Sequence, residues 1–200
     1  MPAGVPNPNV AALAQKIPSG PVFITGPGFI GTRLLQHYLS HEIQISLLIQ
    51  EKYRPEIERV LQQARATQTV KADVVLLKGD ITRPRMGLSD KDFAVARLAK
   101  SALHMAAAYH LELKKNVGQQ VNVEGTKNVL DALALFAGLE HFGYFSTIAV
   151  SGSHQGVFSP EELDVGQKFN NHYARSKFVA EQLVRDRMTD IPTTVLDPVL

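Results

Sequence analysis

The residues best suited to chemistry are a tyrosine and a lysine four positions apart, Tyr173 and Lys177. The surrounding sequence predicts a helix, and on a helix this spacing places both side chains on one face. A phenol in water loses its proton only near pH 10, and a neighbouring ammonium makes proton transfer near neutral pH feasible by stabilising the phenolate. The pair is therefore a candidate acid/base unit, although the same spacing also occurs in surface pairs without function.

Two hydroxyl side chains, Ser146 and Thr147, stand at the end of a predicted strand at 142–146. In open α/β sheets the ligand crevice lies beyond the carboxyl ends of the strands. Either hydroxyl alone is explained as the start of a loop. Together with a bound dinucleotide, they provide a hydroxyl that holds a carbonyl oxygen while the phenol protonates it.

A glycine-rich turn, Gly26-Pro27-Gly28-Phe29-Ile30-Gly31, spells G-x-G-x-x-G between a predicted strand at 21–25 and a predicted helix that runs to about residue 40. Glycines allow a tight turn, close approach to a pyrophosphate, and close packing of helix on strand. The phosphates then meet the free N–H groups of the helix N-terminus. A turn without a ligand is the alternative, but its place on the first strand favours dinucleotide binding.

The choice between NAD and NADP depends on the end of the second predicted strand, where an acidic residue favours NAD and a basic one NADP. The sequence there, Ile49-Gln50-Glu51-Lys52, is ambiguous. Arg33 and Lys52 are candidates to meet a 2′-phosphate, and each is also explained as a solvated surface charge. The sequence gives a slight preference for NADP.

Six short apolar runs alternate with helical patterns along the chain. The predicted strands are 21–25, 43–49, 74–77, 102–105, 142–146 and 193–196. The predicted helices follow the glycine turn and occupy 54–67, 89–99 with Ser89 as N-cap, 117–136 and 171–187. Strands separated by helices of this length need crossover connections, so we expect an α/β fold: a doubly wound parallel sheet, the Rossmann fold, with helices on both faces.

Composition excludes several classes of function. The 21 basic and 19 acidic residues give a formal charge of +2 without any block of like charge, so nucleic acid is not an expected partner. The absence of cysteine excludes disulfides and thiolate metal sites, and the seven histidines are scattered, so we expect no metal. No apolar stretch reaches the roughly 18 residues of a membrane span. A reducing, cytoplasmic location is the expectation.

The chain divides into a short leader and one domain. Residues 1–20 hold four prolines and are predicted to be a loose leader. Residues 21–200 are predicted to form one dinucleotide-binding domain.

Several motifs in their order and spacing resemble the extended short-chain dehydrogenase/reductase family from about residue 21 to 200. The matching segments are TGPGFIG (25–31), GDI (79–81), HMAA (104–107), NVEGT (122–126), STIAVSG (146–152) and YARSK (173–177). Within that family, GDITRPRMGLS and VNVEGTKNVLDAL are most similar to the thioester-reductase and fatty-acyl-reductase branch.

The resemblance implies roles for individual residues. Tyr173 would be the catalytic acid/base, Lys177 would bind the nicotinamide ribose and activate the tyrosine, and Thr147 matches the catalytic Ser/Thr. The implied cofactor contacts, besides Tyr173 and Lys177, are Thr25, Gly26, Gly28, Phe29, Ile30, Gly31, Arg33, Asp80, Ile81, Met105, Ala106, Ala107 and Asn122. Without the resemblance, Asp80 reads as a turn residue, His104 as a satisfied core histidine and Asn122 as a solvated helix residue.

Three features depart from the family pattern. The phosphate loop has one residue fewer between Gly26 and Gly28 than the usual TGxxGxxG. Asp197-Pro198 stands where family members usually have Arg-Pro, which replaces a cation by an anion. The sequence stops after the sixth predicted strand, before the C-terminal region that closes over the substrate in family members, so we expect the Rossmann portion alone.

These observations favour an NAD(P)-dependent oxidoreductase that acts on a small carbonyl or acyl-thioester substrate. A sugar-nucleotide epimerase or dehydratase uses the same core, and a non-catalytic dinucleotide-binding sensor or remnant would explain the departures. The intact Thr147, Tyr173 and Lys177 argue against the last. The apolar stripe of the helix at 117–136 is consistent with a homodimer interface and equally with packing on the sheet.

Overall fold

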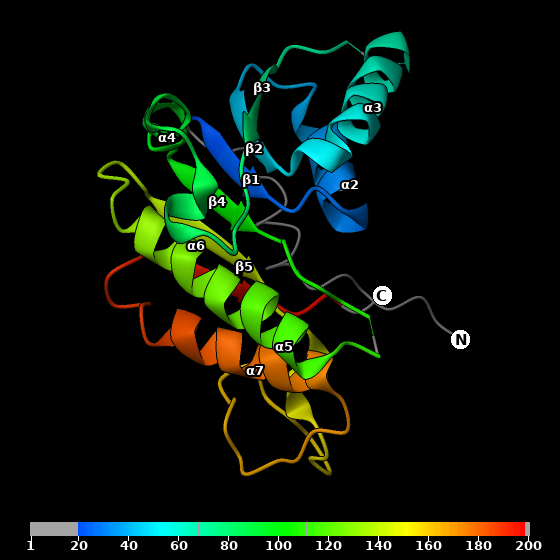
Figure 1. Cartoon of the computed structure of the whole chain (residues 1–200), viewed down its shortest axis with the longest axis vertical. Coiled ribbons are helices and arrows are strands. Elements are labelled where there is room, and N and C mark those ends of the chain that lie inside the picture. Colours follow the sequence, from blue (N-terminus) through cyan, green and yellow to red (C-terminus); the bar gives the residue numbers. More distant parts are fainter. Residues whose placement is uncertain (1–19, 68, 111, 199–200) are drawn as a thin grey trace.

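The computed structural model describes residues 20–67, 69–110 and 112–198. Its centre is a six-stranded parallel sheet with strand order β3-β2-β1-β4-β5-β6 (Figure 1). The strands are β1 (Val22–Thr25), β2 (Gln44–Ile49), β3 (Asp73–Lys78), β4 (Ser101–His104), β5 (His141–Phe145) and β6 (Thr193–Leu196). This order reverses direction at β1, so the crevice between the carboxyl ends of β1 and β4 is the expected dinucleotide site. The predicted doubly wound sheet is confirmed.

Helices cover both faces of the sheet, as predicted. They are α2 (Phe29–Tyr38), α3 (Arg54–Thr67), α4 (Asp90–Ala96), α5 (Lys115–Val117), α6 (Gly125–Leu133) and α7 (His172–Arg185). Short 3-10 turns lie at η1 (Glu51–Tyr53), η2 (Pro84–Gly87) and η4 (Ile148–Ser151). Ser89 caps α4, since its side chain accepts a hydrogen bond from the backbone N–H of Asp92, as the sequence predicted.

Two apolar cores lie on opposite faces of the sheet. The side chains of α2 and α3 pack on β1 and β2, for example Leu35 on Ile24. On the other face α4, α6 and α7 pack on β1, β4 and β5, and Phe136 meets Phe23 edge to face. Figure 1 shows α5 and α6 end to end along this face, with α7 beside them. Alternate residues of β1 therefore serve different cores, as expected for a central strand buried on both sides.

The predicted helix at 117–136 differs from expectation in its middle. Residues Gly118–Glu124, η3, form a π-helical segment between α5 and α6, and the regular helix ends at Leu133. π-Helical segments are rare and occur often at functional sites. This one carries Asn122, whose side chain is turned into the protein. The other element boundaries differ from the predicted ones by a few residues, within the usual uncertainty of helix and strand ends.

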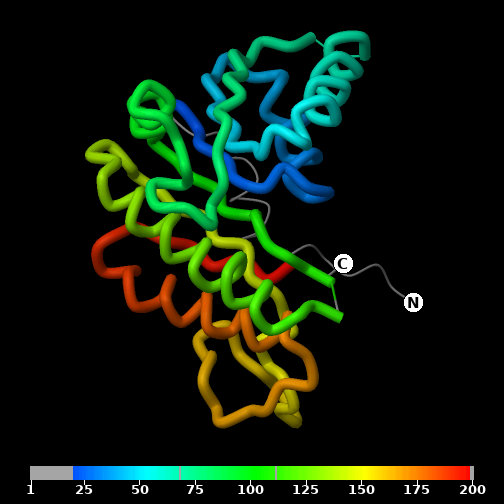
Figure 2. The backbone as a smooth tube through the Cα atoms, viewed as in Figure 1, coloured from blue at the N-terminus to red at the C-terminus, as the bar shows by residue number. Residues whose placement is uncertain are grey.

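The chain that links η4 to α7 lies at one end of the molecule, away from α2 and α3 (Figure 2). Apart from Gly20, the predicted leader at 1–20 lies outside the described residues. Among the residues that the structure describes, no helix has the length and hydrophobicity needed to cross a bilayer. The same residues contain no cluster of three or more histidine or carboxylate side chains placed to hold a metal ion.

Candidate active site

The three glycines of the turn have different steric surroundings. Gly26 has a φ of +71°, and a Cβ there would lie 2.3 Å from the backbone N and Cα of Ala106. A Cβ on Gly31 would lie 2.9 Å from the carbonyl oxygen of Gly26, so this glycine lets α2 pack close to β1. A Cβ on Gly28 would meet nothing within 4 Å. Gly26 and Gly31 are thus required by the protein's own packing, whereas Gly28 leaves space for a ligand.

The N-terminus of α2 is open towards that space. Within the described residues, the backbone N–H groups of Phe29, Ile30 and Gly31 have no hydrogen-bond partner, and Gly28 provides no side-chain cap. Thr32 Oγ1 donates to the carbonyl of Pro27 at 3.1 Å and braces the turn. Unpaired N–H groups at the positive end of a helix dipole are what a pyrophosphate needs. The turn therefore fits a dinucleotide despite its shortened loop.

Asp80, at the end of β3, is held by its neighbours. Its Oδ1 accepts hydrogen bonds from the backbone N–H of Thr82 at 2.9 Å and from Thr82 Oγ1 at 2.8 Å, and its Oδ2 accepts one from Gln50 Nε2 at 3.0 Å. Ile81 is buried and packs on Gly125 of α6. The resemblance implied that Asp80 and Ile81 contact the cofactor, at its adenine, and this contact remains a prediction. The bond to Gln50 ties the end of β2, where the ribose would lie, to the end of β3.

The segment after β4 lies beside the glycine turn. Ala106 touches Gly26, and Met105 Cε approaches the position of a Cβ on Gly31. Asn122 fixes the following residue: its Oδ1 accepts from the backbone N–H of Ala108 at 2.7 Å, while its Nδ2 donates to the carbonyl of Ala108 at 3.0 Å. The same Nδ2 also donates to Ser176 Oγ at 2.9 Å. Asn122 is therefore a buried brace between this segment and α7 rather than a solvated helix residue, and its contact with the cofactor stays a prediction.

Thr147 and Tyr173 stand at the carboxyl edge of the sheet. Thr147 Oγ1 accepts a hydrogen bond from the backbone N–H of Ala149 at 3.3 Å, which leaves its own hydroxyl proton free to hold a substrate oxygen. Tyr173 lies in the first turn of α7, where Asn171 caps the helix by accepting from the backbone N–H of Ala174 at 2.8 Å. The phenol is only half-buried.

Lys177 is buried at 3% exposure, one turn after Tyr173. Its Nζ donates to Tyr144 Oη at 2.8 Å and to the carbonyl oxygen of Phe145 at 2.7 Å. Burial lowers the pKa of Lys177 to about 7, against the opposing influence of the carboxylates of Glu181 and Asp197. Near neutral pH this lysine is therefore poised between its charged and neutral forms.

Ser146 belongs to a different interaction from Thr147. Its hydroxyl donates to the carboxylate of Glu181, which is fully buried and is paired with Arg185 at 2.7 Å. Arg185 also donates to the carbonyl oxygens of Pro160, Glu161 and Glu162. The end of β5 is thus linked through α7 to the loop at 160–162.

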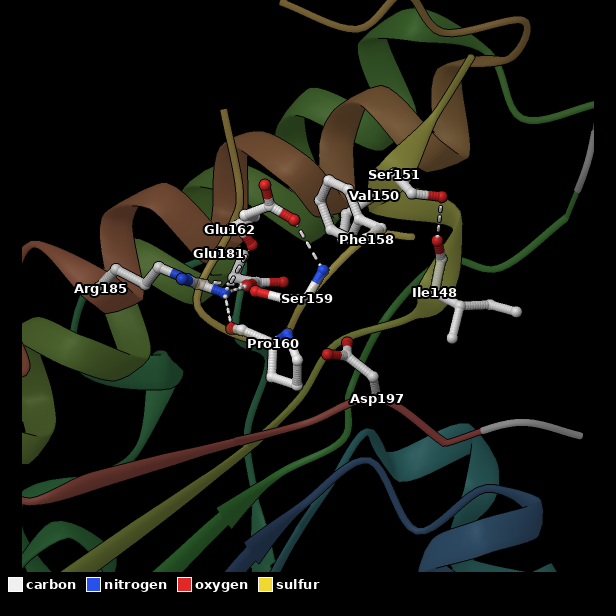
Figure 3. A pocket seen from close by; sticks show the side chains of 10 residues that line it. All are labelled: Ile148, Val150, Ser151, Phe158, Ser159, Pro160, Glu162, Glu181, Arg185 and Asp197. Carbon is white, nitrogen blue, oxygen red and sulfur yellow. Dashed lines mark hydrogen bonds and ion pairs between the residues drawn. The ribbon is translucent and has the colours of Figure 1, made fainter. Parts of the chain in front are cut away.

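A cavity of about 210 Å³ lies between this loop and the end of β6 (Figure 3). Its walls include Ile148, Phe158, Pro160 and Arg185, with the carboxylate of Asp197 turned towards Pro160. Partial burial first, and then the charge of Glu181, raises the pKa of Asp197. The cavity adjoins the candidate site, but neither Thr147, Tyr173 nor Lys177 lines it.

The structure adds residues that sequence reasoning missed: Tyr144, Ser176 and Glu181. Two of them have a signal that was available. Tyr144 precedes Ser146 by two residues in the predicted strand at 142–146 and so shares its face, and Glu181 follows Lys177 by one helical turn. Nothing in the sequence marked these polar side chains as buried.

Comparison with known proteins identifies the family. A family model described as Male sterility protein matches residues 24–199. The nonribosomal peptide synthetase malG of Malbranchea aurantiaca is 28% identical over 207 residues, which cover 93% of this chain and 8% of that protein. An N-acetyl-alpha-D-glucosaminyl-diphospho-ditrans,octacis-undecaprenol 4-epimerase of Escherichia coli O157:H7 is 29% identical over 175 residues, 86% of this chain and 44% of that protein.

Solved structures agree. The terminal R domain from the myxalamid PKS-NRPS biosynthetic pathway superposes with a TM-score of 0.75 at 26% identity, over 90% of this chain and 48% of that one. A UDP-glucuronic acid 4-epimerase from Bacillus cereus, in complex with UDP-glucuronic acid and NAD, superposes with a TM-score of 0.67 at 20% identity, over 88% of this chain and 55% of that one, and shares the fold. The chain spans about half the length of these structures. It belongs to the Male sterility protein family of NAD-binding domains, within the extended short-chain dehydrogenases/reductases.

Proposed function

We propose that the chain is the dinucleotide-binding and catalytic portion, residues 21–200, of an NAD(P)-dependent reductase that transfers hydride to a carbonyl or thioester carbon. The observation that carries this proposal is the buried Lys177, one helical turn from Tyr173, which is bound to the carbonyl of Phe145 at the end of β5, two residues before Thr147. A pure binding module has no need of a hydroxyl donor, a phenol and a buried ammonium at one edge of the sheet. The open glycine turn provides the place for the dinucleotide.

In this mechanism the nicotinamide, when bound, supplies the hydride. The hydroxyl of Thr147 donates a hydrogen bond to the carbonyl oxygen and orients it. Tyr173 gives its proton to that oxygen as the carbon accepts the hydride, and the ammonium of Lys177 stabilises the phenolate that remains. With a thioester, loss of the thiol from the reduced carbon yields an aldehyde.

The substrate class rests on relatives and stays a proposal. The resemblance to peptide synthetases and to a terminal R domain favours an acyl thioester. An epimerase or dehydratase acting on a sugar nucleotide is the second candidate, because epimerases occur among both the sequence and the structural relatives. A homodimer, a cytoplasmic location and a slight preference for NADP are further proposals.

The decisive experiment measures oxidation of NADPH and NADH by the chain with an acyl thioester, an aldehyde and, in parallel, UDP-sugar turnover. We expect Tyr173→Phe to lower the reduction rate by at least about 100-fold, because general acid catalysis contributes that much. Tyr38→Phe, which removes a phenol on α2 away from this edge, is the matched control and should keep the rate. Equal rates for Tyr173→Phe and the unaltered chain would contradict the proposal, and turnover of the UDP-sugar alone would favour the epimerase.

A further inference from the structure

Five polar side chains form a buried polar cluster across the sheet. They come from β1, β4, α6, β5 and α7, and none is more than 3% exposed: Thr25, His104, Thr126, Tyr144 and Lys177. Buried polar groups cost free energy unless they are hydrogen-bonded, so each must find its partner within this set or in the adjacent backbone.

The contacts within the polar cluster are short. Thr25 Oγ1 lies 2.6 Å from His104 Nδ1, and His104 Nε2 lies 3.1 Å from Thr126 Oγ1. Tyr144 Oη accepts from Lys177 Nζ at 2.8 Å, and the same Nζ lies 4.3 Å from the centroid of the Tyr144 ring. The hydroxyl of Thr126 also acts on Tyr144, whose pKa it lowers against the effect of burial. The rings of His104 and Tyr144 lie 5.8 Å apart between centroids, so the five side chains form one buried polar cluster.

An ammonium only donates, so Tyr144 accepts from Lys177. A neutral imidazole donates through one ring nitrogen and accepts through the other, so a neutral His104 can bond both Thr25 and Thr126. Burial first, and then the charge of Lys177, lowers the pKa of His104 to about 3, and this keeps the ring neutral.

The same bonds orient the ammonium. Of its three N–H groups, one goes to Tyr144 and one to the carbonyl of Phe145, so rotation about the Cε–Nζ bond is fixed. The third N–H therefore has one direction available. A phenylalanine at position 144 would keep the ring beneath Nζ but would lose the hydroxyl acceptor.

We propose that Tyr144 is a positioning residue for Lys177: its buried hydroxyl, together with the carbonyl of Phe145, fixes the direction of the ammonium and stabilises its charged form. The effect on turnover rests on the proposed function. The effect on the lysine itself does not, because every group of the polar cluster belongs to the protein.

Other charged and titratable groups also face this lysine. Glu181 on α7 and Asp197 after β6 favour the ammonium, whereas burial disfavours it. His104 on β4 is neutral, and Tyr173 is the half-buried phenol of the same helix. Burial raises the pKa of Tyr144 well above its usual value, so this hydroxyl stays protonated over the working range. Its contribution to Lys177 is therefore that of a neutral acceptor at every pH of interest.

The test follows the ionisation of Lys177 directly, in the chain without cofactor. The Cε resonance of Lys177, identified by its loss in Lys177→Arg, is titrated by NMR in the unaltered chain, in Tyr144→Phe and in Thr126→Val. We expect the midpoint to fall by about one pH unit in Tyr144→Phe, because the charged form loses a hydrogen bond. Thr126→Val, which removes the support of the phenol, should lower it in the same direction by less.

A midpoint in Tyr144→Phe equal to that of the unaltered chain would overturn the proposal. Phe142→Leu is the control, because Phe142 is equally buried on the same strand but lies outside the polar cluster. It should leave the midpoint unchanged. If Tyr144→Phe does not fold, Thr126→Val decides alone, and an unshifted midpoint there overturns the proposal. A reductase that proves inactive would not alter these midpoints, so failure of the proposed function and failure of this inference remain distinguishable.

Discussion

At the glycine turn, Gly28 and Phe29 are exposed, and three backbone N–H groups have no hydrogen-bond partner among the described residues. At the other end of the candidate site, by contrast, Lys177 is buried and its ammonium is hydrogen-bonded to the protein. The two regions prepare for a cofactor in different ways. The lysine end is completed by the protein's own side chains. The turn offers only backbone and space, so the ligand must complete it.

The difference follows from the groups involved. A buried ammonium without partners would cost several kcal/mol, so it folds only together with its acceptors. The N–H groups at a helix N-terminus bind water when no ligand is present, so leaving them without a protein partner costs little free energy. Catalytic groups can therefore be prepared in advance, while the phosphate site remains open to entry.

The largest effect is expected when a methyl group is added within the glycine turn. Gly26→Ala should destabilise the fold by about 3 kcal/mol, because it places a Cβ at positive φ and against the backbone of Ala106. Gly28→Ala should cost less than about 1 kcal/mol of stability but lower NADPH and NADH affinity at least about tenfold. Urea denaturation and fluorescence titration measure the two effects separately.

Gly156→Ala separates backbone strain from steric clash, since Gly156 has a φ of +101° with nothing near its Cβ position. It should cost about 1 kcal/mol. Dinucleotide affinity that survives in Gly28→Ala would show that the open side of the turn is not where the phosphates bind.

At the lysine end, the neutral histidine predicts a dependence of stability on pH. The pKa of His104 is about 3 in the fold and near 6.5 when unfolded, so the unfolded chain binds more protons between these values. Its contribution to stability is complete above about pH 6.5 and is lost as the pH falls towards 3. Between pH 7 and pH 5 the loss should be about 2 kcal/mol.

His104→Gln removes this proton uptake while keeping a side chain that hydrogen-bonds. Its free energy of unfolding should therefore fall by about 2 kcal/mol less than that of the unaltered chain between pH 7 and pH 5, whatever its stability at pH 7. Parallel urea curves at the two pH values test this. Identical pH slopes would show that the histidine is not held neutral.

The glycine turn and the lysine end differ in how well the sequence predicted them. The glycine turn could be predicted because its requirements are local: spacing, φ and the start of a helix act within six residues, 26–31. The parallel sheet with helices on both faces followed from alternating strands and helices, whereas its strand order came from the structure. The lysine end depends on contacts between distant residues, such as His104 with Thr25, whose pairing no local pattern contains.

Burial of charged residues was the other hidden property. Lys177 and Glu181 lie one helical turn apart on a predicted helix, and the sequence did not indicate that either is buried, yet both are inside. The π-helical segment was equally hidden, because its regular apolar pattern continues through it. The structure shows that the buried Asn122 lies in this segment and binds Ala108 and Ser176.

The smallest effect concerns the outer edge of the turn, where cofactor choice is decided. Arg33 is exposed, with its guanidinium 4.8 Å from the ring centroid of Phe29, and it stands on α2 beside the open helix N-terminus. If it meets a 2′-phosphate, Arg33→Ala should weaken NADPH binding about tenfold, roughly 1.4 kcal/mol, and leave NADH binding unchanged. Lys52→Ala, which removes the other candidate cation, is measured in parallel. Equal affinities for NADPH in Arg33→Ala and the unaltered chain would show that Arg33 does not bind the 2′-phosphate, and that any preference for NADPH comes from other residues. Equal losses for both cofactors would mean that Arg33 supports the turn itself, because only the 2′-phosphate distinguishes the two ligands.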